Sequence, residues 1–213
     1  MIEARGLLFD MDGTLVDSVA AVERTWRGWA ALHSLDPIPI LAVAHGRRGI
    51  DTVRMFAPEG VDVEAEAARL AEVEREQTEG IRAVPGAAAL LRSLPPGSWA
   101  VVTSADRALA TSRMALAGLP TPDLLITAED VTTGKPDPQG YRLAAQRLGL
   151  AAEDCIVFED APAGIAAGRA SGAMLVVVAT TLPRAELTGE AWIEDFSGAS
   201  VSIVAGRLCV HFA

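Results

Sequence analysis

The chain has 213 residues, of which 50% are hydrophobic and 22% charged, a composition that supports a folded core and excludes a disordered chain. The formal net charge of −10 argues against binding to nucleic acid or to an anionic membrane surface, because no basic stripe offsets the acidic total. The apolar runs are shorter than a membrane helix requires, and residues 1–5 lack a signal-peptide pattern. A soluble, cytoplasmic protein is therefore expected, with Cys155 and Cys209 as buried, reduced thiols.

Most of the chain alternates between short apolar runs and stretches with helical periodicity. The expected strands, each bounded by Gly, Pro, Asp or Ser, are 6–9, 99–102, 123–126, 155–158 and 174–179. The expected helices between them are 106–116, 138–148 and 161–170. Strands that alternate with helices are typical of a parallel sheet covered on both faces. The sequence therefore predicts a doubly wound, Rossmann-like α/β domain.

The segment 16–83 interrupts this alternation, because it shows helical periodicity throughout and contains no convincing strand. Asp17-Ser18 suits a helix start, and the residues that recur on one face of the first helix are Val22, Trp26, Trp29, Ala30 and His33. The acidic run in 62–80 is interpreted as a solvated helix face. We therefore predict a core of 1–15 and 84–213 with a small helical domain, 16–83, inserted into it.

The end of the chain predicts a β-hairpin. Two strand-like runs, 200–204 and 207–212, flank the dipeptide Ala205-Gly206, which suits a tight turn. His33 and His211 are assigned structural roles.

Two carboxylates follow the first strand, at Asp10 and Asp12, with Gly13 next in the chain. Ligands bind at the carboxyl ends of strands in open α/β sheets. Carboxylates two residues apart, followed by a glycine that permits a sharp turn, can share a hard cation. A calcium loop of the EF-hand type is excluded, because Leu15 and Ala21 stand where that loop requires Gly and Glu.

Three other strand ends carry suitable partners. Thr103 and Ser104 follow the second core strand and lead into a helix, which suits a phosphate oxygen. Lys135 is the only lysine among 18 basic residues. Glu159 and Asp160 form a second acidic pair at a helix start. Taken singly, Thr103 also suits a helix cap and the acidic pair a helix dipole, but the combination fits phosphoryl transfer through an aspartyl phosphate.

These residues lie in four motifs that resemble those of the haloacid dehalogenase superfamily, and specifically its capped sugar- and polyol-phosphate phosphatases. The motifs, in order, are Asp10-Met11-Asp12-Gly13-Thr14, Thr103, Lys135 within Gly-Lys-Pro-Asp-Pro, and the run from Phe158 to Ile165. The resemblance implies that Asp10 is the nucleophile, Asp12 the acid/base, and Thr103 and Lys135 the groups that hold phosphate. The expected activity is hydrolysis of a small sugar or polyol phosphate monoester.

The same resemblance implies a Mg²⁺ cofactor. Its ligands would be the carboxylates of Asp10 and Asp160 and the main-chain oxygen of Asp12, with Glu159 adjacent. The expected partner is a small phosphorylated metabolite. The sequence does not fix the oligomeric state.

The inserted segment resembles the helical cap of such phosphatases. Residues 44–51 are similar to the cap segment of the 2-deoxyglucose-6-phosphate and glycerol-phosphate phosphatases, in which a His-Gly-x-Arg pattern faces the active site. Arg48 is thereby expected to contact the substrate, with His45 and Trp26 as further substrate-binding candidates. The alternative is that Arg47 and Arg48 only solvate a helix start.

Three other functions fit the sequence less well. β-Phosphoglucomutases share these motifs, but Val22 stands where they carry a hinge histidine, and the expected cap lacks their lysine. A phospho-receiver regulatory domain pairs similar groups, yet its acceptor aspartate follows a middle strand in the chain and it has no helical insert. A catalytically silent binding protein is disfavoured because every catalytic position is filled.

Overall fold

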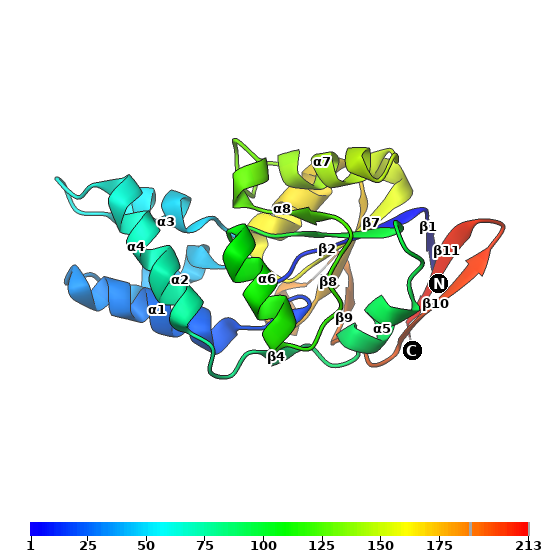
Figure 1. The fold of residues 1–213 in the computed structure, drawn as a ribbon, viewed down its shortest axis with the longest axis horizontal. Helices are drawn as coiled ribbons and strands as arrows, with labels where there is room; N and C mark the ends of the chain where they lie inside the picture. Colours follow the sequence, from blue (N-terminus) through cyan, green and yellow to red (C-terminus); the bar gives the residue numbers. More distant parts are fainter. Residues whose placement is uncertain (188, 213) are drawn as a thin grey trace.

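The computed structural model describes residues 1–187 and 189–212, and a six-stranded parallel sheet lies at its centre (Figure 1). The strand order is β6-β5-β2-β7-β8-β9, so β2, the first of these strands in the chain, lies in the interior of the sheet. The strands are β2 (Gly6–Phe9), β5 (Trp99–Val102), β6 (Leu125–Ile126), β7 (Cys155–Glu159), β8 (Met174–Val178) and β9 (Ala191–Ile193). Phe9 of β2 pairs with Val101 of β5 and Phe158 of β7, so these three strands end at one edge.

Helices cover both faces of this sheet. Leu7 and Phe9 face a core shared with α5 (Ala87–Ser93) and α6 (Arg107–Leu116). Leu8 points to the opposite core, shared with α7 (Gln139–Arg147) and α8 (Pro162–Ser171). Short 3₁₀ turns complete the connections at Ala128–Asp130, Ala152–Asp154 and Arg184–Glu186. The doubly wound α/β prediction is confirmed.

Four helices lie between β2 and α5 in the chain. They gather at one end of the molecule (Figure 1). They are α1 (Val19–Leu32), α2 (Pro37–Ala44), α3 (Gly49–Phe56) and α4 (Val63–Glu76). Their apolar faces build a cluster of their own, which includes Trp26, Trp29, Ile40 and Leu70. The chain enters and leaves them through a two-stranded ribbon, β3 (Val16–Asp17) paired antiparallel with β4 (Arg82–Ala83).

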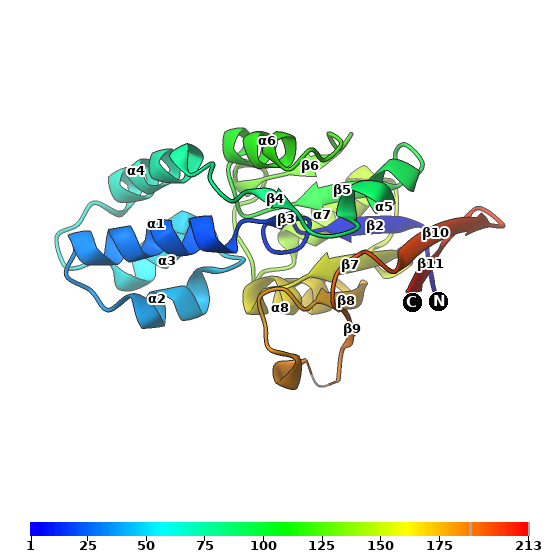
Figure 2. The same cartoon turned by 90° about the horizontal axis from the view of Figure 1, so that it is seen from below.

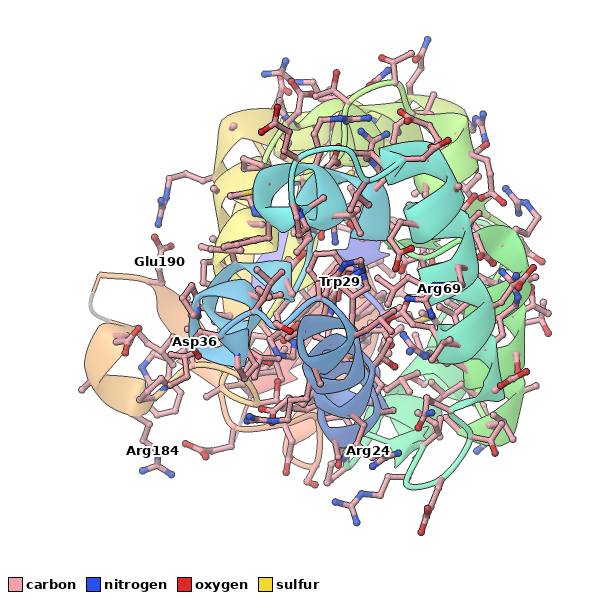
Figure 3. The ribbon with its side chains drawn as sticks, turned by 90° about the vertical axis from the view of Figure 1, so that its left-hand side faces the viewer. Arg24, Trp29, Asp36, Arg69, Arg184 and Glu190 are labelled. Carbon is pink, nitrogen blue, oxygen red and sulfur yellow. The ribbon has the colours of Figure 1, made fainter. Side chains whose placement is uncertain are left out.

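A polar cluster joins α1 to α4, and two of its residues, Trp29 and Arg69, are labelled in Figure 3. The Trp29 indole nitrogen donates to Glu66 Oε1 at 3.0 Å, and His33 Nε2 lies 3.1 Å from the same oxygen. Arg69 also pairs with Glu66, and this hydrogen bond, the largest influence, helps to lower the pKa of Glu66 to about 2. The acidic run of α4 is therefore not entirely a solvated face, because Glu66 turns inward.

A separate antiparallel sheet ties the two ends of the chain together (Figure 2). The expected hairpin is confirmed as β10 (Ala199–Val204) and β11 (Arg207–Phe212). A strand that was not expected, β1 (Ile2–Ala4), pairs with β11. Cys155 and Cys209 are both buried and free, as expected. Among the described residues, no helix has the length and apolar character needed to span a membrane.

Candidate active site

The aligned ends of β2, β5 and β7 gather the polar residues of the four motifs. Asp10 directly follows β2, Thr103 directly follows β5, and Glu159 ends β7 with Asp160 next. Asp10, Thr103, Glu159 and Asp160 are all buried. Burying so many polar groups is costly unless they are paired or bind a ligand. Here the buried carboxylates are paired with Lys135 and with hydroxyl groups.

Lys135 enters this cluster from the loop before α7, and all three of its ammonium donors have a partner. Its Nζ contacts Asp10 Oδ1 and donates to Glu159 Oε1 at 2.6 Å and to the carbonyl oxygen of Val102 at 3.1 Å. Burial alone would lower the pKa of Lys135, but Asp10 and Glu159 outweigh it and hold that pKa above its ordinary value. The lysine is therefore a fixed positive charge against Asp10.

Glu159 holds this lysine in place. Its Oε1 also accepts a hydrogen bond from the Tyr141 hydroxyl at 2.7 Å, and its Oε2 accepts from the backbone amides of Asp160 and Ala161 at 3.0 and 3.3 Å. A Cβ on Gly164 of α8 would collide with this carboxylate. Both oxygens of Glu159 are thus used by protein partners, which together donate four hydrogen bonds to it.

Asp160 approaches Asp10 from the neighbouring strand end. Its Oδ1 accepts from the Thr14 hydroxyl at 2.8 Å, and its Oδ2 contacts the Thr181 hydroxyl. Gly13, with φ of +87°, permits this approach, because a Cβ there would collide with the carboxylate. The sequence signal for Thr14 was its place inside the first motif.

The carboxylates form a site that suits a hard cation. Asp10, Glu159 and Asp160 each offer an oxygen, and these oxygens lie within 4.8 Å of one another. Burial, followed by repulsion from Glu159, raises the pKa of Asp10 well above its usual range and that of Asp160 to about 7. Oxygen ligands that repel one another in this way fit a divalent cation such as Mg²⁺.

Asp12 turns away from this cluster toward the helical insert. Its Oδ1 accepts a hydrogen bond from Ser18 at 2.6 Å and lies 2.8 Å from Nη1 of Arg113 on α6. Ser18 was expected to start a helix, and it is the N-cap of α1, but its hydroxyl makes no capping bond because it is used by Asp12. Sequence reasoning missed Arg113 and Glu74 of α4, which lies beside it. The sequence signal for Arg113 was its position on the face of α6 whose other residues, at three- and four-residue intervals, are apolar.

A cavity of about 50 Å³ lies between the sheet edge and the helical insert. Asp10, Asp12 and Thr103 line its floor. The substrate-binding candidates that it brings together are Trp26, His45 and Ser104. Burial lowers the pKa of His45, despite the opposing effect of Glu23 and Asp12. Ser104 also donates to the Gly46 carbonyl at 2.8 Å, a direct link between core and insert.

Arg48, the expected substrate contact, does not line this cavity. Its guanidinium pairs with Asp51 at 2.7 and 3.1 Å and donates to the carbonyls of Val131 and Thr132 at 3.4 and 3.2 Å. It is therefore already used in holding the insert to the loop before Lys135. Arg47 lines the cavity instead and forms no ion pair within the described part of the chain.

The fold and this site together define a hydrolytic enzyme built around buried carboxylates at the edge of a parallel sheet. The family model described as haloacid dehalogenase-like hydrolase matches residues 4–172, and the chain belongs to this family.

Characterised relatives of this chain include phosphatases. It is 48% identical to hexitol phosphatase A of Escherichia coli strain K12 over 181 residues, which cover 83% of this chain and 84% of that protein. It is 36% identical to glycerol-1-phosphate phosphohydrolase 1 of Saccharomyces cerevisiae, over 84% of this chain and 76% of that one. Among solved structures, a hydrolase from Pseudomonas syringae superposes with a TM-score of 0.78 at 26% identity, covering 91% of this chain and 94% of its own.

Proposed function

We propose that this enzyme hydrolyses phosphate monoesters of small sugars or polyols, using Mg²⁺ and an aspartyl-phosphate intermediate on Asp10. The observation that carries the proposal is the placement of Asp10 against the Lys135 ammonium, on the floor of a cavity that Asp12 also lines. The relatives named as hexitol and glycerol-1-phosphate phosphatases support the substrate class.

Asp10 and Asp160 are the carboxylates proposed to hold Mg²⁺, with the main-chain oxygen of Asp12 as a third ligand. Because Glu159 already accepts four hydrogen bonds, we propose that it fixes Lys135 rather than ligating the ion directly. When bound, Mg²⁺ supplies positive charge that neutralises the phosphate and keeps Asp10 ionised. Without that charge, the carboxylates would repel a phosphate dianion.

In the first step, an Asp10 oxygen attacks phosphorus while the bond from phosphorus to the alcohol oxygen breaks. Asp12 gives its proton to that departing oxygen. Lys135 and Thr103 bind the phosphoryl oxygens and stabilise the charge that develops on them. The products are the free alcohol and phosphorylated Asp10.

In the second step, water attacks the phosphorus of phosphorylated Asp10. Asp12 takes a proton from this water, the bond between phosphorus and the Asp10 oxygen breaks, and inorganic phosphate leaves. Asp12 therefore returns to its protonated state, and Asp10 to its carboxylate.

We propose that residues 16–83 act as a cap over this chemistry and select the alcohol part of the substrate. His45, Trp26 and Arg47 reach the cavity from the cap, and Ser104 from the core. A cavity of about 50 Å³ is far smaller than the roughly 300–1,000 Å³ of typical ligand pockets. The cap must therefore lift to admit a sugar or polyol phosphate.

The test combines turnover with trapping of the intermediate. Phosphate release from hexitol, hexose and glycerol phosphates should require Mg²⁺ and stop in excess chelator. Asp10→Asn should be inactive. Asp12→Asn given acetyl phosphate, whose leaving group needs little protonation, should accumulate a phosphoryl group that peptide mass spectrometry assigns to Asp10. Asp154→Asn is the matched control and should behave as wild type, because Asp154 is a half-buried carboxylate that precedes β7 and pairs with Arg5. Normal turnover by Asp10→Asn would refute the proposal.

A further inference from the structure

Arg113 on α6 is a buried guanidinium. Its side chain is 3% exposed, and its Nη1 lies 2.8 Å from Asp12 Oδ1. Its Nη2 lies 3.8 Å from Glu74 Oε1 of α4, beyond hydrogen-bonding distance. Arg113 thus stands between the proposed acid/base of the core and an acidic residue of the cap.

The guanidinium is poorly satisfied for a group that serves only to hold the fold. Its Nε and Nη2 are buried and have no hydrogen-bond partner in the described residues. Leaving buried donors of a charged group unpaired is costly. The other buried side chains of α6 are the apolar Leu109, Ala110 and Met114, so the close charged partner of Arg113 is Asp12, with Glu74 more distant. The one strong contact, to Asp12, is therefore what the arginine provides.

The contact fixes how Asp12 is presented. Ser18 and Arg113 approach the same oxygen, Oδ1. Two donors on one oxygen restrict rotation of the carboxylate, and no hydrogen bond to Oδ2 is found among the described residues. Because Asp12 lines the cavity with Asp10, Oδ2 is the oxygen available to a leaving group.

We propose that Arg113 is a positioning residue for the reaction: with Ser18 it holds Asp12 Oδ1 so that Oδ2 exchanges the proton with the departing alcohol and then with water. The inference rests on the proposed phosphatase function. Arg113 does not touch the substrate and acts through Asp12 alone. Its loss should therefore matter in proportion to how much the leaving group needs a proton.

The experiment compares Arg113→Met and Arg113→Lys on two kinds of substrate in the full-length enzyme with Mg²⁺. Glycerol phosphate has an alkoxide leaving group that needs protonation, whereas p-nitrophenyl phosphate has one that leaves readily without it. Arg113→Met should lose about 10²-fold in kcat on glycerol phosphate, the lower end of what acid/base catalysis contributes. The same variant should lose less than about threefold in the rate of p-nitrophenyl phosphate cleavage, measured as the burst of nitrophenol. Arg113→Lys, which keeps the charge, should recover part of the loss.

Arg107→Met is the control, because Arg107 begins the same helix but its side chain is half exposed and pairs with Asp130. It should leave the ratio of the two rates unchanged. Equal losses on both substrates by Arg113→Met, or no loss on either, would overturn the inference while leaving the phosphatase function intact. Absence of turnover by the wild-type enzyme on every phosphate ester would instead overturn the proposed function. Thermal unfolding of each variant confirms that the comparison is made on folded protein.

Discussion

Arg47 and Arg48 are adjacent in sequence, yet they have different surroundings. Arg47 lines the cavity beside Asp10 and has no ion-pair partner in the described residues, whereas Arg48 is held by Asp51 and two core carbonyls. A guanidinium that is free and faces a carboxylate-lined cavity is suited to an anionic or hydroxyl-rich ligand. A guanidinium that is already paired is suited to holding two segments together.

We therefore expect Arg47→Ala to weaken use of the preferred polyol phosphate more than Arg48→Ala does. Hydrogen bonds to charged groups contribute about 1.5–3 kcal/mol, which corresponds to a loss of roughly 10- to 100-fold in kcat/KM for Arg47→Ala. Steady-state kinetics on hexitol and glycerol phosphates measure this difference. A larger loss for Arg48→Ala would show that the cap rearranges when substrate binds and that Arg48 exchanges its partners for the ligand.

Three of the four motifs were predictable from sequence at this scale because Asp10, Thr103 and the Glu159-Asp160 pair lie directly at strand ends, and strand ends of a parallel sheet converge by geometry. Which of two neighbouring arginines faces the cavity was not predictable, because it depends on the backbone conformation of a short loop. Arg113 was missed for a related reason. Its burial results from the packing of α4 against α6, two helices that lie far apart in the chain.

At the scale of elements, α8 is positioned by a close approach to the site. Gly164 lies in its first turn, where the Glu159 carboxylate occupies the space that a Cβ would take. Gly28 in α1 contrasts with it, because Gly28 is exposed and nothing lies within 4 Å of an added Cβ. In the sequence, both are single glycines inside a helix. In the structure, only Gly164 has no room for a side chain.

Alanine at these two positions should therefore have opposite effects. Gly28→Ala should stabilise the protein by about 1 kcal/mol, the difference in helix propensity, with unchanged activity. Gly164→Ala should destabilise it by about 3 kcal/mol, the upper end of overpacking costs, and reduce turnover because Glu159 and hence Lys135 must shift. Urea unfolding and phosphate release measure the two effects. A neutral Gly164→Ala variant would mean that α8 can move away from the site without cost.

The strands of the sheet interior were predictable because they are continuous apolar runs, whereas the edge elements were predictable only in part. β9 includes Trp192, which is 40% exposed, so it lacks both a fully buried run and a regular alternation. β6 is shorter than the expected strand 123–126, since only Leu125 and Ile126 pair with β5. β1 is three residues long and pairs with β11 from the opposite end of the chain, a partnership that no local pattern encodes.

At the scale of the whole molecule, the buried carboxylates link metal binding to stability. Asp160 has a pKa of about 7 in the folded protein, raised from 3.8 by burial and by Glu159. An acid whose pKa is raised on folding keeps its proton in the folded state after the unfolded chain has lost it. The stability of the metal-free protein should therefore fall as pH rises from about 4 to 7. Burial also raises the pKa of Glu74 to about 7, so Glu74 contributes a further loss of stability over the same pH range.

Mg²⁺ should reverse the part of this loss of stability that comes from its proposed ligands, Asp160 among them. We expect the ion to raise Tm more at pH 8 than at pH 5.5, because it binds the ionised carboxylates and stabilises the folded state by mass action. Calorimetry in Mg²⁺ and in chelator at each pH gives the change in Tm that Mg²⁺ causes. The contribution of Glu74 is the same with and without the ion, so it cancels from this change. Asp160→Asn should abolish the Mg²⁺ effect. An equal Mg²⁺ effect at both pH values would contradict the proposed ligands.

The solitary lysine also changes how the protein can be handled chemically. Lys135 is 6% exposed, and it is the only side-chain amine in the sequence. Reagents that acylate lysine amines therefore have one target in this sequence, and it is covered inside the candidate active site. The rate at which Lys135 is acylated then measures how often the site opens to solvent.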